Sequence, residues 1–250
     1  MRILVCNDDG FEAPGLHLLA KAARVIAPDV WVVAPDHKWT AASHQLSFDR
    51  DLTLTRTGER AYACSGAPAD CVVAAMAILF ADEPKPDVVL AGINDKRNVA
   101  EDIAYSGTMA IAREATFWGV PAIAVSQAMP ATDGPAEFDA LCRLLRALWK
   151  SRDQWAANGH WLSVNLPGAL PATVVQARVG RDKLASACDV IANTPERIVY
   201  RIRRGRPGTS VPGDENAQIA AGRITVVQHC WYADAPVPDA TVTAWSDAVA

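Results

Sequence analysis

Two adjacent carboxylates, Asp8 and Asp9, come shortly after the apolar run Ile3–Val5 near the start of the chain. Carboxylates held side by side repel each other, so both stay ionised only where a counter-charge such as a divalent cation is near. A hydroxyl from Thr40 and an amide oxygen from Asn94 follow two other apolar runs. Four hard oxygen donors of this kind suit Mg²⁺. If the three loops meet, the pattern predicts a metal site.

Each of these residues also has a simpler interpretation. Asp8 and Asp9 precede Gly10, and aspartates before a glycine are common in turns at strand ends. Asn94 is equally typical of a turn. No single residue decides between the two interpretations, but the occurrence of oxygen donors at three strand ends favours the metal site.

The tripeptide Ser106-Gly107-Thr108 begins a predicted helix and is a candidate phosphate site. Free N–H groups at a helix start, a glycine that permits close approach and two hydroxyls suit an anion. The same tripeptide is also an ordinary helix start. Asn98 precedes it and is positioned to donate its amide to a phosphate oxygen. Three cations in the same loops are either phosphate contacts or solvated surface charges: Lys38, Lys96 and Arg97.

Short apolar runs and amphipathic helices alternate along the chain and predict the elements that carry these loops. The predicted strands cover residues 2–6, 31–34, 87–91, 122–125 and 161–166, and residues 52–64 predict a hairpin. The predicted helices cover residues 14–26, 68–80, 106–118 and 136–149. Continuous apolar strands covered by helices are typical of an α/β fold with a doubly wound, mostly parallel sheet. Ligands of such sheets bind at the carboxyl ends of the strands, where the candidate residues lie.

The pattern changes after Pro167. Ile198, Tyr200 and Ile202 alternate with Val199 and two arginines, which predicts a half-exposed strand, and residues 224–226 repeat this alternation. Residues 205–222 are rich in glycine, proline and polar residues. We therefore expect an α/β catalytic body over residues 1–168, and an antiparallel hairpin arm with a C-terminal tail over residues 169–250.

Composition limits which classes of partner and which cellular compartment we expect for the protein. The 250 residues are 50% hydrophobic with a net charge of −4, which suits one large core but argues against nucleic-acid polymers or membranes as partners. No apolar stretch approaches the roughly 20 residues of a membrane span, and the first residues do not fit a signal peptide. The six cysteines show no CxxC spacing. We expect reduced, mostly buried thiols and a cytoplasmic location.

Taken together, these motifs resemble the SurE survival-protein nucleotidases. The shared motifs are RILVCNDDG over 2–10, SGAPADC over 65–71, Gly92-Ile93-Asn94, Asn98, YSGT over 105–108, GVPAIAVS over 119–126 and VNLP over 164–167. They span residues 1 to about 168 in the family's order, which makes them far more specific as a set than singly. Beyond residue 170 only 222–228 is similar to the family.

The resemblance implies a metal-dependent phosphomonoesterase of the 5′-nucleotidase type, acting on nucleoside 5′-monophosphates and sometimes on 3′-monophosphates or short polyphosphate. It implies one divalent cation per subunit, Mg²⁺ or Mn²⁺, and a homodimer or homotetramer formed through swapped C-terminal elements, a role that suits residues 169–250. The implied metal ligands are Asp8, Asp9, Thr40 and Asn94, of which Asp8 and Asp9 are catalytic. The implied phosphate contacts are Asn98, Ser106, Gly107 and Thr108.

The chain departs from the family pattern in two loops. Thr40-Ala41 replaces the family's Ser-Gly, which keeps a hydroxyl ligand but adds a Cβ where backbone approaches substrate. Asp95-Lys96-Arg97 replaces a small glycine-containing turn. A left-handed conformation at Lys96 would cost about 1–2 kcal/mol; alternatively, the loop has a new shape and Lys96 or Arg97 reaches the phosphate. Trp39 either stacks on a base or is an ordinary packed tryptophan.

Two other classes of protein share some of these features. A phospho-signalling receiver domain also has an acidic pair after its first strand and an acid after its third, for which Asp95 would serve. It also needs a lysine after its last core strand, where this chain has Ser126-Gln127, and the chain is about twice as long. The second alternative is a nucleotide- or phosphate-binding protein that keeps the metal fold and has lost turnover through its altered loops.

Overall fold

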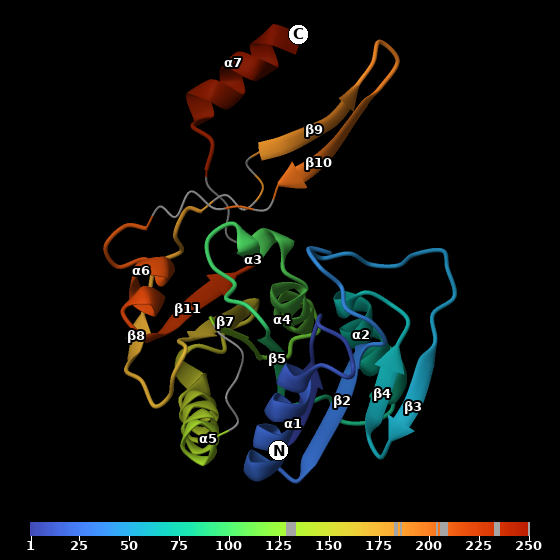
Figure 1. Ribbon diagram of the computed structural model, residues 1–250, viewed down its shortest axis with the longest axis vertical. Coiled ribbons are helices and arrows are strands. Elements are labelled where there is room, and N and C mark those ends of the chain that lie inside the picture. Colours follow the sequence, from blue (N-terminus) through green and yellow to red (C-terminus); the bar gives the residue numbers. More distant parts are fainter. Residues whose placement is uncertain are drawn as a thin grey trace.

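The computed structural model describes residues 1–128, 134–182, 185, 187–203, 205, 210–232 and 236–249. Its centre is a nine-stranded sheet in the order β3-β4-β2-β1-β5-β6-β7-β11-β8 (Figure 1). The strands are β1 (Arg2–Cys6), β2 (Asp29–Pro35), β3 (Leu54–Gly58), β4 (Ala61–Cys64), β5 (Val88–Asn94), β6 (Ala122–Gln127), β7 (His160–Leu166), β8 (Val174–Gln176) and β11 (Ile224–Cys230). Neighbours from β4 to β7 are parallel, whereas β3 and β11 run antiparallel to β4 and β7.

Helices cover both faces of the sheet. On one face lie α1 (Pro14–Ile26) and α5 (Pro135–Lys150); on the other lie α2 (Pro68–Ala74), the π-helical turn Ala75–Leu79 and α4 (Gly107–Phe117). Successive side chains of a strand point to opposite faces, so Ile3 and Val5 pack with the first group and Leu4 and Cys6 with the second. Burial on both faces explains why β1 is a continuous apolar run.

The doubly wound sheet and the hairpin β3–β4 agree with the sequence-based predictions. The predicted helix over 68–80 changes to π-helical hydrogen bonding at Ala75, for which we have no physical account. The predicted helix over 106–118 begins at Gly107, because Ser106 has extended backbone and accepts a hydrogen bond from the Met109 amide as its N-cap. All six cysteines are free thiols, and four of them are buried. No helix in the described ranges combines the length and the apolar composition needed to cross a membrane.

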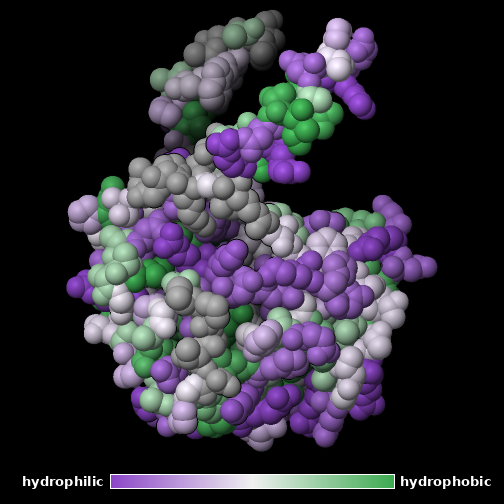
Figure 2. All heavy atoms as spheres, viewed as in Figure 1, coloured by the Kyte–Doolittle hydropathy of each residue, from purple (hydrophilic) through white to green (hydrophobic). Residues whose placement is uncertain are grey.

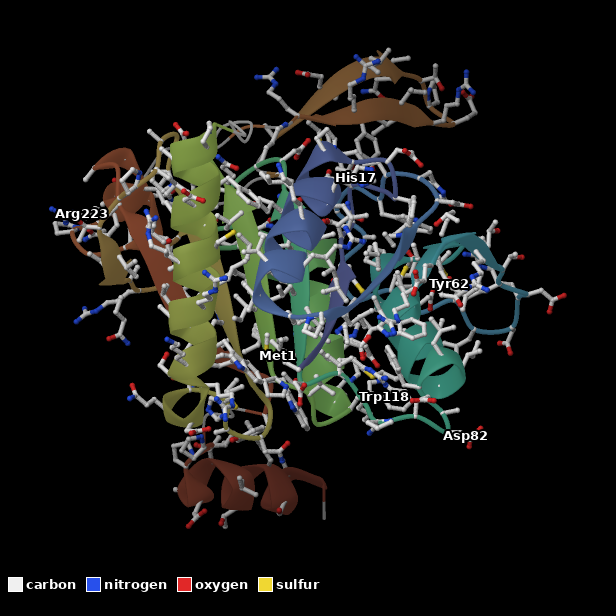
Figure 3. All side chains as sticks on the ribbon, turned by 90° about the horizontal axis from the view of Figure 1, so that it is seen from below. Met1, His17, Tyr62, Asp82, Trp118 and Arg223 are labelled. Atoms are coloured by element: carbon white, nitrogen blue, oxygen red, sulfur yellow. The ribbon has the colours of Figure 1, made fainter. Side chains whose placement is uncertain are left out.

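Residues 169–250 divide between the body and a projection. β8, α6 (Glu215–Ala220) and β11 join the main sheet, with Ile224 and Val227 buried, so the body continues beyond residue 168. The antiparallel pair β9 (Ala187–Asn193) and β10 (Ile198–Arg203) is the expected hairpin arm, and α7 (Asp239–Val249) follows it. The arm and α7 extend beyond the body, on opposite sides of it when seen from below (Figures 1 and 3).

The projecting hairpin carries exposed apolar side chains. Figure 2 shows a hydrophobic cluster on its stem, and five of its apolar residues are each more than half exposed: Val190, Ile191, Ile198, Tyr200 and Ile202. On α7, Trp245 is also more than half exposed. Contiguous apolar surface of this kind on a projecting element is typical of an interaction site.

Candidate functional site

The carboxyl ends of β1, β2 and β5 border one cavity of about 410 Å³. These strands are direct neighbours, with β1 in the middle, so the loops that follow them share one edge of the sheet. Six of the eight predicted site residues line the cavity: Asp8, Asp9, Thr40, Asn94, Asn98 and Ser106. The other two, Gly107 and Thr108, are buried beside Asp8. The sheet therefore brings the predicted residues together.

Asp8 is packed against the start of α4. Its Oδ1 accepts a hydrogen bond from the Thr108 hydroxyl. A Cβ built on Gly107 would lie 2.7 Å from the Asp8 Cβ, so only glycine lets the helix start approach this closely. Burial raises the pKa of Asp8 to about 6, and the charge of Asp9 adds to this rise while the Thr108 hydrogen bond opposes it. Thr108, expected as a phosphate contact, thus uses its hydroxyl to hold Asp8.

Asp9 has a different environment. Its Oδ2 accepts a hydrogen bond from the Asp95 amide at 3.0 Å, and its Oδ1 contacts the Lys38 ammonium. Lys38 also donates to Asp95 Oδ2 at 2.7 Å, so one cation bridges two carboxylates. Partial burial lowers the pKa of Lys38, but the hydrogen bonds to Asp9 and Asp95 outweigh this and raise it. Sequence reasoning noted Lys38 as a nearby cation without identifying this bridge.

The two asparagines are fixed by neighbouring elements. Asn94 ends β5 and donates its side-chain amide to the Lys96 carbonyl, which leaves its amide oxygen as the available ligand atom. Asn98 donates its side-chain amide to Ser126 Oγ at 2.9 Å, so one of its two amide hydrogens remains for a phosphate. The backbone of Asn98 exchanges two hydrogen bonds with the side chain of Asn165, at 2.9 and 3.0 Å. Asn165 and Ser126 lie in motifs noted in the sequence. Only the order of the strands in the sheet shows that these two residues position Asn98.

The loop after β2 carries Thr40 over the cavity. Ala41 and Ser43 have φ of 56° and 54°, a left-handed conformation that costs about 1–2 kcal/mol at Ala41 and that was considered in the sequence only for Lys96. The loop is held by Ser43, whose amide and hydroxyl donate to the Tyr105 and Ala104 carbonyls. Lys96 is not among the described residues with positive φ, so the strain considered there does not arise.

The loop of Asn98 is also fastened to the C-terminal part of the chain. Glu215, at the start of α6, accepts a hydrogen bond from the Ala100 amide at 3.1 Å, and Ala100 has a φ of 53°. Glu101 accepts hydrogen bonds from Arg181 Nε and the Asp182 amide. Residues beyond 168 therefore position the candidate phosphate loop, which the sequence did not indicate.

Replacing Glu215 with glutamine will remove a pH-dependent loss of stability. Burial raises the pKa of Glu215 to about 7, while backbone N–H groups of Ala100 and Gly180 oppose the rise. A carboxyl whose pKa is raised on folding stabilises the folded protein at pH values below its ordinary pKa. This contribution is lost as the pH rises through the folded-state pKa of about 7. The loss amounts to about 2.5 kcal/mol between pH 5 and 8. Chemical denaturation at pH 5 and pH 8 measures it.

Glutamine keeps an acceptor for the Ala100 amide, so Glu215→Gln isolates the ionisation. The wild type and the exposed-site control Glu59→Gln will lose the same stability between the two pH values, and Glu215→Gln will lose less. Equal losses in all three proteins would mean that Glu215 does not take up its proton on folding.

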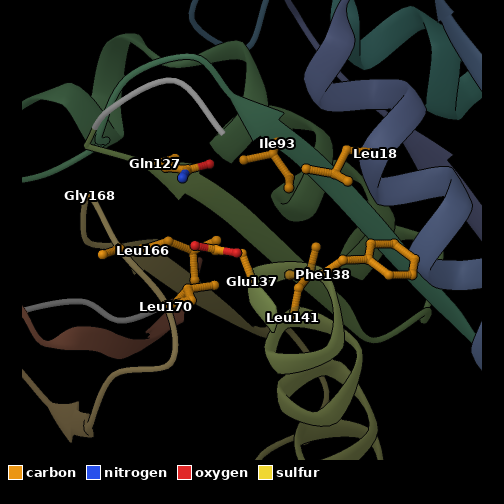
Figure 4. A pocket seen from close by; sticks show the side chains of 10 residues that line it. Leu18, Ile93, Gln127, Glu137, Phe138, Leu141, Leu166, Gly168 and Leu170 are labelled. Atoms are coloured by element: carbon orange, nitrogen blue, oxygen red, sulfur yellow. The ribbon is translucent and has the colours of Figure 1, made fainter. Parts of the chain in front are cut away.

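A second hollow in the described structure is too small for a substrate. It measures about 10 Å³ and lies between α1, α5 and the loop after β7, as the view of its lining in Figure 4 shows. Leu18, Phe138, Leu141 and Leu166 make it mainly apolar. It is a packing defect of the core rather than a candidate site.

The donor atoms at the large cavity fit a hard divalent cation. Asp8 and Asp9 supply carboxylate oxygens, and Asn94 and Thr40 line the same cavity with amide and hydroxyl oxygens. No group of three or more His, Cys, Asp or Glu side chains within the described residues is arranged to hold a metal ion. A site here therefore depends on the two neutral oxygen donors as well as the acidic pair.

Comparisons with known proteins identify the family of the chain. The family model described as survival protein SurE matches residues 3–186. The 5′-nucleotidase SurE of Methylorubrum extorquens is 43% identical over 177 residues, which cover 70% of this chain and 69% of that protein. That of Azorhizobium caulinodans is 37% identical over 233 residues, covering 90% and 91%. The crystal structure of the SurE protein from Aquifex aeolicus superposes with a TM-score of 0.77 at 26% identity, covering 100% of this chain and 99% of that one.

Proposed function

Because the chain belongs to the survival protein SurE family, we propose that it is a metal-dependent phosphomonoesterase that hydrolyses nucleoside 5′-monophosphates. The observation that carries this proposal is the contact between Asp8 and the N-terminus of α4. Asp8 would bind the cation and the helix start would bind an anion, so their contact supports a site in which one phosphate meets both. The receiver-domain alternative fails because Ser126, bonded to Asn98, occupies the place of its lysine.

The ligands of the cation, in this proposal, are Asp8, Asp9, Thr40 and Asn94, and the cation is Mg²⁺ or Mn²⁺. When bound, a divalent cation neutralises phosphate charge and lowers the pKa of a bound water. Of the two carboxylates, Asp8 is held by Thr108 and Asp9 by the Asp95 amide, so each keeps one fixed orientation. Asp8 or Asp9 then orients the attacking water and accepts its proton.

The phosphate contacts come from the chain itself. Ser106 Oγ accepts from the Met109 amide, so its hydroxyl hydrogen is free to donate to a phosphate oxygen. The N–H of Gly107, next to Ser106 at the start of α4, and the remaining amide hydrogen of Asn98 add two donors. Preorganised donors of this kind stabilise charge that builds up on the transferred group. Thr108 is a positioning residue for Asp8.

We extend the proposal to a homo-oligomer formed through the arm. The apolar side chains of β9 and β10 are exposed in the single chain, and a second copy of the same chain would cover them. Six free thiols support a reducing, cytoplasmic setting. No feature of the described residues favours the binding protein without turnover.

Phosphate release from 5′- and 3′-nucleoside monophosphates, assayed with Mg²⁺, Mn²⁺ or EDTA, tests the proposed function. We expect release that requires metal and is fastest on 5′-monophosphates. The absence of release from every substrate with either metal would overturn the proposal, and tight nucleotide binding without release would establish the alternative in its place.

Replacing Lys38 with methionine will raise the affinity for Mn²⁺ about tenfold, because the Lys38 ammonium competes for the Asp9 carboxylate. Methionine keeps most of the side chain's apolar length. Calorimetric titration with Mn²⁺ measures the change without relying on activity. The control Lys150→Met removes a lysine at the end of α5, far from the cavity, and will leave the affinity unchanged. An unchanged or weaker affinity in Lys38→Met would show that the lysine does not compete.

A further inference from the structure

Three cationic side chains line the large cavity, and their surroundings differ. Lys38 is neutralised by Asp9 and Asp95. Within the described residues, neither the Lys96 ammonium nor the Arg97 guanidinium forms a hydrogen bond or an ion pair. In the part of the chain that the structure describes, these two positive charges of the cavity therefore have no partner.

The backbone that carries these two cations is fixed at both ends. On one side, the Asp95 amide donates to Asp9, and the Lys96 carbonyl accepts from Asn94. On the other side, Asn98 is bonded to Asn165 and Ser126. Lys96 and Arg97 thus lie on a short segment held to Asp9, β5, β6 and β7; Lys96 is exposed and Arg97 is half-buried. Held this way, the pair resembles a prepared binding group more than a solvated surface charge.

The phosphoryl group that is cleaved already has its own donors and cation ligands. Ser106, Gly107 and Asn98 contact it in the proposed function, with the cation at Asp8 and Asp9. Two further cations at the same cavity exceed what one phosphoryl group needs. The volume of about 410 Å³ is ample for a whole nucleotide, so Lys96 and Arg97 lie within reach of another part of the same substrate.

We propose that Lys96 and Arg97 bind a second phosphoryl group, so that the preferred substrate is a nucleotide that carries two. The inference rests on the proposed phosphatase function. Arg97 offers a planar fork suited to two phosphate oxygens, and Lys96 offers a point charge. When the second phosphoryl group is on the sugar, water attacks the phosphorus of the 5′-phosphoryl group and the P–O bond to the ribose breaks, so inorganic phosphate leaves and the ribose oxygen takes a proton. When the two groups form an anhydride, water attacks the terminal phosphorus and the P–O bond to the inner phosphate breaks, so inorganic phosphate leaves and the inner phosphate keeps the bridging oxygen. In both cases the second phosphoryl group stays on the product.

The test compares AMP, adenosine 3′,5′-bisphosphate and ADP as substrates of the wild type and of Lys96→Met, Arg97→Met and the double variant. We expect the wild type to have a kcat/KM at least about tenfold higher for the bisphosphate than for AMP. The double variant will lose this preference through KM, by about 10- to 100-fold, and will change less than about threefold on AMP. The control Arg143→Met, an exposed arginine on α5, will keep the wild-type preference.

The ADP comparison identifies where the second phosphoryl group sits. A preference for the bisphosphate places it on the sugar, and one for ADP places it in an anhydride chain; both support the subsite if the double variant removes them. Equal losses on AMP and on the doubly phosphorylated substrates would overturn it. If no substrate releases phosphate, the proposed function fails, and calorimetric binding of adenosine 3′,5′-bisphosphate decides the subsite. If the double variant binds the bisphosphate more weakly than the wild type and the Arg143→Met control do, the subsite is supported. Unchanged binding by the double variant overturns it.

Discussion

Replacing Asp8 with asparagine will lower kcat for hydrolysis of a nucleoside 5′-monophosphate by about 10³-fold while the fold stays intact. Asp8 is the more buried carboxylate of the acidic pair and the one that touches the helix start. The substitution removes one negative charge from the proposed cation site and leaves a weaker neutral oxygen in its place. The measurement is kcat at saturating metal, beside the Mn²⁺ affinity from calorimetry, which will fall as well.

The fold should tolerate this change because asparagine keeps an oxygen that accepts from the Thr108 hydroxyl. Burial opposes the charged form of Asp8 and raises its pKa, so a neutral side chain removes a cost and Tm will stay level or rise. The control is Asp95→Asn, a half-exposed carboxylate at the same cavity that is not a proposed ligand. It will lower kcat less than about tenfold. Activity of Asp8→Asn within a few fold of the wild type would remove Asp8 from the ligand set.

The parts of the site that could be predicted from sequence lie at the ends of strands or in the loops that follow them. The apolar run of β1 shows where the strand ends, so Asp8 and Asp9 had to lie at the carboxyl edge of a parallel sheet. Asn94 and Thr40 were found in the same way. The residues that hold the site are different: Asn165 reaches Asn98 only because β7 lies next to β6. Strand order is set by long-range packing and leaves no local pattern.

The C-terminal third shows the same limit. The alternation at β10 predicted the hairpin, because a half-exposed strand carries its period in the sequence. β8 has only three residues, too few for a period, and β11 shows its role only by pairing with β7. Glu215 likewise carried no signal, since a glutamate at a helix start is ordinarily a solvated residue. Its function becomes visible only where it meets Ala100.

Replacing Gly107 with alanine will lower kcat by about 100-fold, the effect expected from moving a catalytic group by about 1 Å. The new Cβ would lie 2.7 Å from the Asp8 Cβ and 2.8 Å from Pro68 Cγ, closer than real Cβ contacts allow. Asp8 or the start of α4 must therefore shift. Overpacking of this kind also destabilises a protein by about 1–3 kcal/mol, so activity is to be measured well below the Tm of the variant.

The control Gly58→Ala places its Cβ 3.6 Å from the Ala61 Cβ, an ordinary contact, and will leave kcat unchanged. If Gly107→Ala loses activity while circular dichroism shows a folded protein, the close contact between acidic pair and helix start is required for catalysis. Full activity would mean that this contact can open without consequence. These two outcomes matter because neither the helix start nor the acidic pair suffices alone. A helix start attracts any anion, and an acidic pair attracts any cation. Phosphate hydrolysis needs both on one phosphoryl group, and Gly107 is the residue whose missing side chain lets them meet.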